Sequence, residues 1–196
     1  MTVLRDKVVK ELAEINVQGN EEGLIPAFNV FVNQLPVKFW TTFAERMIKA
    51  TPPERYKEVD EALVNCAHEC GYHTGYGIIN SEEFKAVVMP MVTEGAVDVL
   101  RGAFAVFTAW GWAKSGIVQI KEGERMIIRA TDYYESDGTP GQKRAFMIRG
   151  VSAAFFELAY GDTYPNGINS FDCQQSKGIE AGDNFGEFVV TQKIPL

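Results

Sequence analysis

The stretch that decides the fold is GIVQIKEGERMIIRA, residues 116–130, where the apolar pattern changes from helical to alternating. Apolar and polar side chains alternate along residues 116–121 and again along residues 125–130. The Glu122-Gly123 pair between these runs is typical of a hairpin turn. The stretch therefore predicts two antiparallel strands, and the apolar residues before it follow a helical spacing.

The sequence before this hairpin predicts a series of helices. Apolar residues recur at helical spacing in segments 2–15, 36–51, 53–76 and 93–110. A shorter helix is predicted after Asn80, which is in the position of an N-cap. The helix at 93–110 is apolar almost all round, so we expect it to be buried.

After the hairpin, residues 143–160 predict a strongly apolar helix that ends at Gly161, and residues 137–141 predict a loop. Two further strands are predicted at 170–177 and 185–192. The expected fold class is α+β, in which N-terminal helices precede two antiparallel β-hairpins separated by a buried helix. We expect one domain over residues 1–196.

Composition and charge exclude several classes of partner. The chain has 196 residues, with 19 Lys and Arg against 26 Asp and Glu, and its formal net charge is -7. A net negative surface favours neither nucleic acid nor an anionic membrane. Three cysteines without disulfide-like spacing indicate a reducing compartment, and the first residues lack the apolar region of a secretory signal. We therefore expect a cytoplasmic protein that binds no nucleic acid and no membrane.

Histidine and cysteine are concentrated in one short segment. The chain has two histidines and three cysteines, and four of these five residues lie within 66–73. On a helix, Cys66, Glu69, Cys70 and His73 would share one face. His68 would point about 200° away from Cys66, so we expect it to face solvent.

Three interpretations of this face remain open. It can form a thiolate–imidazole metal site, although structural zinc sites usually draw ligands from two chain segments. It can also contain a reactive thiol, with Cys70 as nucleophile, His73 as base and Glu69 or Tyr72 assisting. In the third interpretation the cysteines pack as small apolar groups, and Gly71 and Gly75 allow another helix to approach closely. We expect no metal and no other cofactor.

Aromatic residues gather near the ends of the predicted elements and can line an apolar pocket or fill the core. The sequence contains no GxGxxG, Walker-type, HExxH or GxSxG motif, so nucleotide-dependent chemistry and the common hydrolase triads have no support. The residues expected to contact a ligand are Cys66, Tyr72, Tyr76, Trp110, Trp112, Phe146 and Phe155.

The second half of the chain resembles the 4-vinyl reductase domain, a family often described as hydrocarbon-binding. The resemblance covers a helix ending in AWGW (109–112), the strand pair, RAFMIRG (144–150), the following small-residue helix, and GDNFGEF (182–188). An earlier helix at 62–77 is similar to the leading helix of the family. Residues 61–196 would then form the ligand-binding core, and residues 1–60 an N-terminal helical extension.

The chain also departs from the family pattern. The family tends to carry cysteines at the start of the late helix and in the closing element, where this chain has Arg144 or Ala145 and Gly186. This difference puts in doubt any metal-binding role of those positions. The resemblance implies an α+β domain that often forms a homodimer and holds a small apolar organic molecule.

The sequence leaves three functions open. The first is a ligand-binding domain with a sensory or accessory role. Its pocket would be lined by Cys70, His73, Tyr76, Trp110, Phe146 and Phe155. The second is a hydrolase- or lyase-like enzyme that uses the Cys70–His73 pair. The third is a structural or assembly subunit, which would show a flat exposed apolar patch without a cavity.

Overall fold

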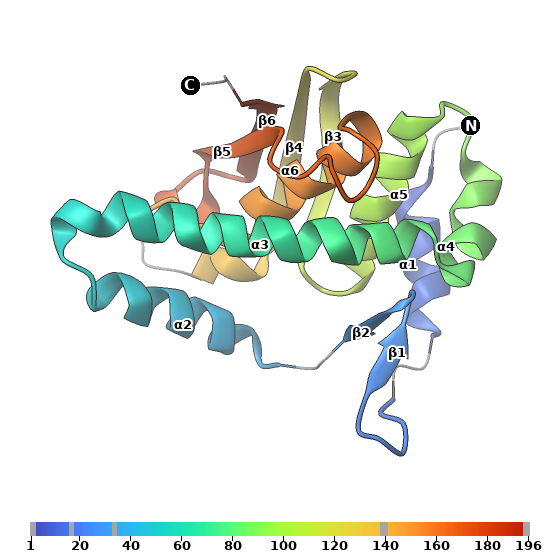
Figure 1. Ribbon diagram of the computed structural model, residues 1–196, viewed down its shortest axis with the longest axis horizontal. Helices are drawn as coiled ribbons and strands as arrows, with labels where there is room; N and C mark the ends of the chain where they lie inside the picture. The colour runs from blue at the N-terminus through green and yellow to red at the C-terminus, as the bar shows by residue number, and fades with distance from the viewer. Residues whose placement is uncertain (1–2, 16–17, 33–34, 138–140, 194–196) are drawn as a thin grey trace.

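The structure is a computed structural model that describes residues 3–15, 18–32, 35–137 and 141–193 (Figure 1). It combines helices with antiparallel sheets, so the predicted α+β class is confirmed. The predicted start of the first helix at Thr2, and residues 138–140 of the predicted loop, lie outside the described residues.

The predicted helices and strands occur along the chain in the predicted order. The helices are α1 (Arg5–Ala13), α2 (Val37–Lys49), α3 (Tyr56–Ile79), α4 (Glu82–Val87), α5 (Ala96–Ala109) and α6 (Phe146–Tyr160). The strands are β1 (Ile25–Ala27), β2 (Val30–Val32), β3 (Ala113–Lys121), β4 (Arg125–Tyr133), β5 (Phe171–Lys177) and β6 (Gly186–Gln192).

The two predicted hairpins join into one sheet. Its strand order is β3-β4-β6-β5, and all neighbours are antiparallel. The central pairing sets Ile128 of β4 opposite Phe188 of β6. Both side chains are fully buried in the core that the sheet shares with α5 and α6. Alternation along the strands thus directs one face of the sheet toward these helices.

Helix α6 lies between the sheet and α3, and it packs against both (Figure 1). Gly150, Ser152, Ala153 and Ala154 keep its middle narrow enough to be buried on all sides. Helix α5 is buried as predicted, and α1 packs along it. None of the described helices is both long enough and apolar enough to span a bilayer.

Two local features differ from the sequence prediction. The β1–β2 hairpin was not predicted, because each of its strands has three residues and is too short to show alternation. Its turn residues, Phe28 and Asn29, have φ of 52° and 59°. The cap of α4 is Ser81 rather than Asn80, since the Phe84 backbone N–H donates to Ser81 Oγ at 3.1 Å.

Candidate functional site

The face of α3 that packs against the core is not the face that carries the Cys-His cluster. Cys66, Glu69, Cys70 and His73 are exposed, whereas His68 is 2% exposed. The prediction that His68 faces solvent was therefore wrong. The interpretation of Cys66 and Cys70 as buried packing groups was also wrong.

Small residues explain which face of α3 is buried. A Cβ on Gly71 would lie 3.0 Å from the Val151 Cα, and one on Gly75 would lie 2.7 Å from a Leu158 methyl. Larger residues at these positions would hold α3 and α6 apart. The side of α3 that carries Gly71 and Gly75 therefore faces α6, as the third interpretation anticipated for the two glycines. His68 lies on the same side of the helix and is buried with them.

The buried His68 forms a polar link between three elements. Its Nε2 lies 2.5 Å from Oε2 of Glu157, and the Glu157 side chain is fully buried in the last turn of α6. The second carboxylate oxygen of Glu157 accepts a hydrogen bond of 2.9 Å from the Phe171 backbone N–H at the start of β5. One carboxylate therefore ties α3, α6 and the sheet together.

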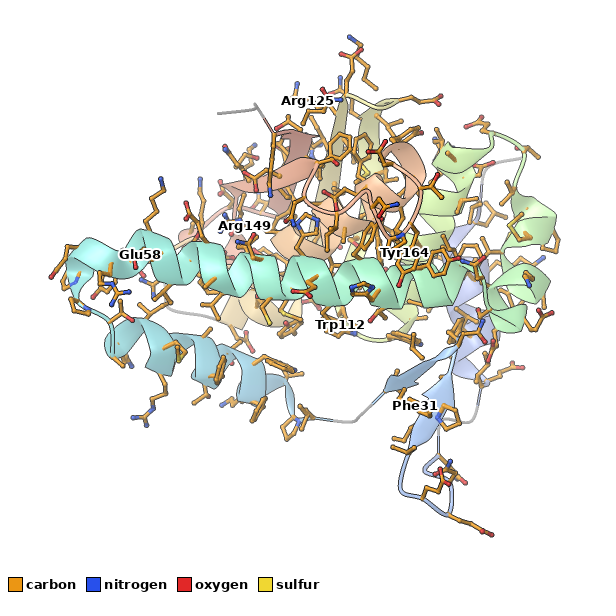
Figure 2. All side chains as sticks on the ribbon, viewed as in Figure 1. Phe31, Glu58, Trp112, Arg125, Arg149 and Tyr164 are labelled. Atoms are coloured by element: carbon orange, nitrogen blue, oxygen red, sulfur yellow. The ribbon has the colours of Figure 1, made fainter. Side chains whose placement is uncertain are left out.

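On the exposed side of α3, His73 is paired with a tyrosine. Its Nδ1 lies 2.8 Å from the Tyr164 hydroxyl, and the Tyr164 ring stacks on Tyr76 with centroids 3.8 Å apart (Figure 2). The sulfur of Cys70 lies 3.9 Å from the Thr74 hydroxyl. Among the described contacts, none joins Cys70 to His73, so the nucleophile–base geometry is not assembled.

The remaining sequence-predicted residues belong to separate packing clusters. Tyr72 is fully buried beside α6, and burial raises the pKa of its hydroxyl. Trp110 packs edge-on against Phe28, while Trp112 stacks on Phe107. Phe155 belongs to the core around the sheet, whereas Phe146 packs in a separate cluster with Ile48.

The described residues contain no group of three or more His, Cys, Asp or Glu side chains placed to hold a metal ion. Cys173, the third cysteine, is buried in β5 and is separated from the exposed Cys66 and Cys70. The outer face of α3 alone thus lacks the ligand set that a tetrahedral zinc site needs.

An apolar pocket of about 190 Å³, partly open to solvent, lies between α3, α5 and α6. Its walls are hydrocarbon side chains and one glycine, contributed by Gly75, Ile79, Ala96, Val99, Leu100, Ala103, Phe155, Leu158 and Ala159. Only Phe155 belongs to the ligand-contacting residues expected from the sequence. The cavity exists because small residues occupy positions where larger side chains would fill the space between the helices.

A smaller cavity of about 70 Å³ lies beneath α2. Trp40, Phe43 and Phe146 form aromatic walls, and Cys66 and Arg144 reach its edge. This volume corresponds to roughly two water molecules at the density of the liquid.

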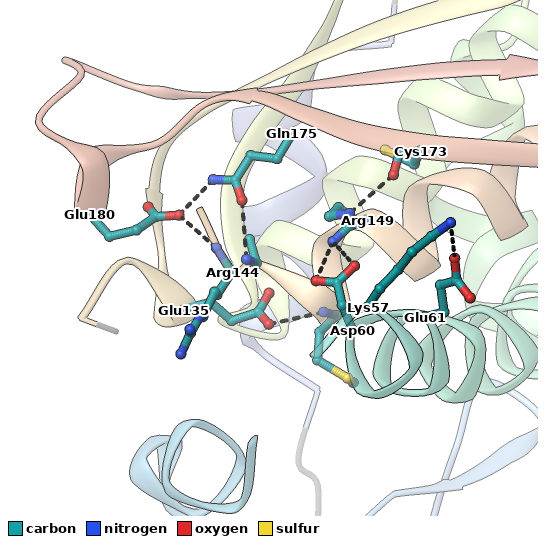
Figure 3. Close-up of polar contacts among 11 residues, drawn as sticks. Lys57, Asp60, Glu61, Glu135, Arg144, Arg149, Cys173, Gln175 and Glu180 are labelled. Atoms are coloured by element: carbon teal, nitrogen blue, oxygen red, sulfur yellow. Dashed lines mark hydrogen bonds and ion pairs between the residues drawn. The ribbon is translucent and has the colours of Figure 1, made fainter. Parts of the chain in front are cut away.

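A buried carboxyl, Glu135, also borders the smaller cavity. It accepts hydrogen bonds from the backbone N–H groups of Met147 (2.9 Å) and Ile148 (3.1 Å), in the first turn of α6 (Figure 3). Burial raises the pKa of Glu135 to about 8, and the nearby Glu180 acts in the same direction. Glu135 therefore caps α6 mainly as a neutral acid at pH 7.

Glu180 belongs to a separate hydrogen-bond network near the start of α6. It accepts a hydrogen bond from the Tyr133 hydroxyl. It accepts another, of 2.6 Å, from the Gln175 side-chain amide (Figure 3). The Arg144 backbone N–H donates to it at 3.4 Å. These contacts occupy the region where the family pattern has cysteines.

The raised pKa of Glu135 predicts a pH-dependent stability. The folded chain holds this proton up to about pH 8, whereas the unfolded chain releases it near pH 4.5. Stability is then greatest below the unfolded pKa and falls as pH rises toward the folded one. From pH 6 to 7.5 the free energy of unfolding should fall by about 2 kcal/mol.

Urea denaturation of the natural chain and of Glu135→Gln at both pH values measures this effect. The glutamine variant should lose most of the pH slope. Equal slopes in the two proteins would assign the pH dependence to other groups.

Sequence reasoning missed His68, Glu157 and Glu135 as buried polar residues. Periodicity treats glutamate as a surface residue, so it did not predict that either acid is buried. The one available signal was the interruption of an otherwise apolar run at Glu157, between Phe156 and Leu158. A charged residue inside such a run indicates a buried partner.

Comparisons with known proteins support the fold. No family profile and no curated protein matches the chain. Among solved structures, the phenol-responsive sensory domain of the transcription activator PoxR, with phenol, has a TM-score of 0.71 at 12% identity. That match covers 98% of this chain and 92% of the sensory domain.

Two further structures resemble the chain. A trafficking protein particle complex subunit 3 from Naegleria fowleri, covalently bound to palmitic acid, has a TM-score of 0.54 at 14% identity, covering 82% of this chain and 94% of that one. A vinyl-4-reductase family protein from Methanocaldococcus jannaschii has a TM-score of 0.48 at 12% identity, covering 97% and 92%. The match to the PoxR sensory domain confirms the resemblance to the 4-vinyl reductase domain at the level of the fold.

Proposed function

We propose that this chain is a small-molecule-binding domain with a sensory or accessory role, and that it holds a small apolar molecule between α3, α5 and α6. The observation that carries the proposal is the apolar cavity of about 190 Å³ between these helices. An apolar cavity of about 150 Å³ is large enough to bind benzene. The cavity therefore has room for a single ring with a short substituent.

The walls of the cavity suit a bound ligand for two reasons. Helices α3 and α6 are held together by the glycine contacts and by the His68–Glu157 pair, so two of the three walls are firmly placed. The Phe155 ring, which packs edge-on against Phe104, offers an aromatic surface to the cavity. Rigid, preorganised walls reduce the entropy lost on binding.

The structural neighbours support the same type of function. One is a phenol-responsive sensory domain crystallised with phenol, and another carries covalently bound palmitic acid. Both have this fold and both hold a small organic molecule. The proposal for this chain rests on its own cavity, and these neighbours show only that the fold accommodates such ligands.

Filling the cavity tests the proposal. Replacing Ala103 and Ala159 together by leucine adds six carbon atoms to the walls, so toluene binding should weaken by about tenfold or more. Isothermal titration calorimetry with toluene as the probe measures the change. The matched control is Ala62→Leu on the exposed side of α3, which should bind toluene like the natural chain.

An unchanged affinity in the double variant would contradict the proposed site. Thermal unfolding of each variant checks that the added leucines leave the chain folded. Absence of toluene binding to the natural chain at millimolar concentration would contradict the function itself.

We also propose that the chain forms a homodimer through the aromatic side of α2, part of which also borders the smaller cavity. Phe39, Trp40 and Phe43 are all exposed there, and their rings contact one another, with Phe39 and Trp40 centroids 5.1 Å apart. Val37 and Met47 extend the same apolar surface. Contiguous exposed apolar surface of this kind is typical of a protein interface.

Charged substitutions on α2 test the dimer. Replacing Phe39 and Phe43 together by lysine should weaken self-association by about tenfold or more, because aromatic residues at interface centres carry much of the binding energy. Sedimentation velocity over a range of concentrations measures it. Val118→Lys is the control, since Val118 is an exposed apolar residue of β3 far from α2 in sequence and fold. A natural chain that is monomeric at every concentration would refute the dimer.

A further inference from the structure

The smaller cavity beneath α2 combines apolar walls with a charged rim, and the proposed function does not use it. Trp40, Phe43 and Phe146 form its aromatic walls. The cavity is partly open to solvent, and Arg144 lies at its edge. Apolar walls together with a small number of polar groups are typical of sites that bind small organic molecules.

The Arg144 guanidinium has no protein partner among the described residues. The Arg144 backbone N–H donates to Glu180, but Figure 3 shows the side chain directed away from Glu180, on the side of α2. Arg149, on α6 itself, is instead paired with Asp60 at 3.0 and 3.1 Å. A guanidinium presents a planar fork of donors that matches a carboxylate, so the half-buried Arg144 can bind an anion at the rim of the cavity.

The start of α6 favours an anion at the same place. Backbone N–H groups at the start of a helix carry a partial positive charge. Glu135 accepts hydrogen bonds from two of them, those of Met147 and Ile148, and also borders the cavity. Because burial raises the pKa of Glu135 to about 8, its carboxyl is mainly neutral at pH 7 and does not cancel this positive charge. The neutral carboxyl also has an O–H group that can donate to a ligand oxygen.

Among the described residues that line the cavity, Glu45 of α2 is the one whose charge opposes an anion. Its side chain is partly exposed, so water screens the carboxylate. No ion pair between Glu45 and Arg144 is among the described contacts. The Arg144 guanidinium and the start of α6 act together against this single carboxylate, and the observations therefore favour an anionic ligand over a cationic one.

We propose that the smaller cavity binds short-chain carboxylates, with the hydrocarbon chain between Phe43 and Phe146 and the carboxylate on the Arg144 guanidinium. The volume of about 70 Å³ is roughly half of the 150 Å³ that holds the six carbon atoms of benzene, so the chain is limited to about three carbon atoms. This site is separate from the pocket between α3, α5 and α6, and it adds a second class of ligand.

Three probes with the same three-carbon chain test the proposal: butyrate, its neutral amide butyramide, and propylammonium. Each is titrated at pH 7 into the full 196-residue chain labelled with ¹⁵N, and NMR follows the indole N–H of Trp40. The Trp40→Phe variant identifies that signal. Butyrate should shift it and bind about tenfold more tightly than butyramide, because a hydrogen bond between two charged groups is stronger than one to a neutral amide.

Two substitutions at the rim should act in opposite directions on butyrate. Arg144→Gln should weaken butyrate binding by about tenfold and leave butyramide binding unchanged. Glu45→Gln should strengthen butyrate binding several-fold, because it removes the opposing charge. The matched control is Arg125→Gln, since Arg125 begins β4 and lies far from α2 (Figure 2). All titrations use one protein concentration, because Trp40 and Phe43 also belong to the proposed dimer surface.

Equal affinities for butyrate and butyramide, or tightest binding of propylammonium, would overturn the proposal. An equal loss of butyrate affinity in Arg144→Gln and Arg125→Gln would also overturn it, since the effect would then reflect net charge alone. Butyrate binding that leaves the Trp40 signal unmoved would place the ligand elsewhere and contradict this site. Thermal unfolding checks that each variant is folded. These outcomes leave the proposed function standing, because toluene binding tests the larger pocket independently.

Discussion

Replacing Glu157 by leucine is expected to lower the free energy of unfolding by about 3–5 kcal/mol. The Glu157 side chain is fully buried, and its two oxygens satisfy His68 Nε2 and the Phe171 backbone N–H. Leucine matches the volume approximately but leaves both groups buried without a partner. Removing one member of a buried pair costs more than the pair contributes, because the remaining group stays desolvated.

A double-mutant cycle separates this cost from simple loss of packing. His68→Leu together with Glu157→Leu removes both polar side chains, so the double variant should be more stable than Glu157→Leu alone. Urea denaturation at pH 7 gives the three free energies of unfolding. A double variant whose loss equals the sum of the single losses would show that the two residues are not coupled.

The control for this cycle is an ion pair at the surface. Glu58 lies 2.7 Å from Arg55, and the two side chains are 61% and 63% exposed. Glu58→Leu should cost much less than Glu157→Leu, since water screens an exposed pair. A comparable loss in both glutamate variants would contradict the role assigned to burial.

The order of helices and strands could be predicted from the sequence because long periodic segments leave few alternatives. The switch to alternation at 116–130 and the apolar helix at 143–160 located the sheet and the central helix to within a few residues. The short β1–β2 hairpin could not be predicted, since three residues per strand carry no measurable period.

The orientation of α3 shows why the candidate site was harder to predict. Two stripes run along this helix at the same spacing, one with Cys66, Cys70 and His73 and one with Gly71 and Gly75. Periodicity identifies a face but does not say which of two faces is buried. The deciding factor is steric, because only the glycine stripe allows α6 to approach. The cavity likewise depends on small residues from three separate helices. The sequence does not show that these residues come together, because the fold alone places the three helices side by side.

Replacing Gly150 by valine is expected to lower the free energy of unfolding by at least about 3 kcal/mol. A Cβ at this position would lie 2.6 Å from the His68 backbone nitrogen, the Val64 carbonyl oxygen and the Ala67 Cβ. Two of these three atoms belong to the backbone of α3, so no side-chain rotation relieves the overlap. Helices α3 and α6 must separate, which also lengthens the His68–Glu157 contact of 2.5 Å.

The same substitution at Gly116 provides the control, because nothing lies within 4 Å of a Cβ built there and β3 is a strand, which valine favours. Urea denaturation should give a lower midpoint for Gly150→Val and an unchanged or higher one for Gly116→Val. If Gly150→Val does not fold, Gly150→Ala tests the same contact: alanine favours a helix over glycine by about 1 kcal/mol, so a net loss of stability must come from the overlap with α3. A gain of stability in Gly150→Ala would mean that α3 and α6 can move apart without loss, and the cavity beside them would then lack two firmly placed walls.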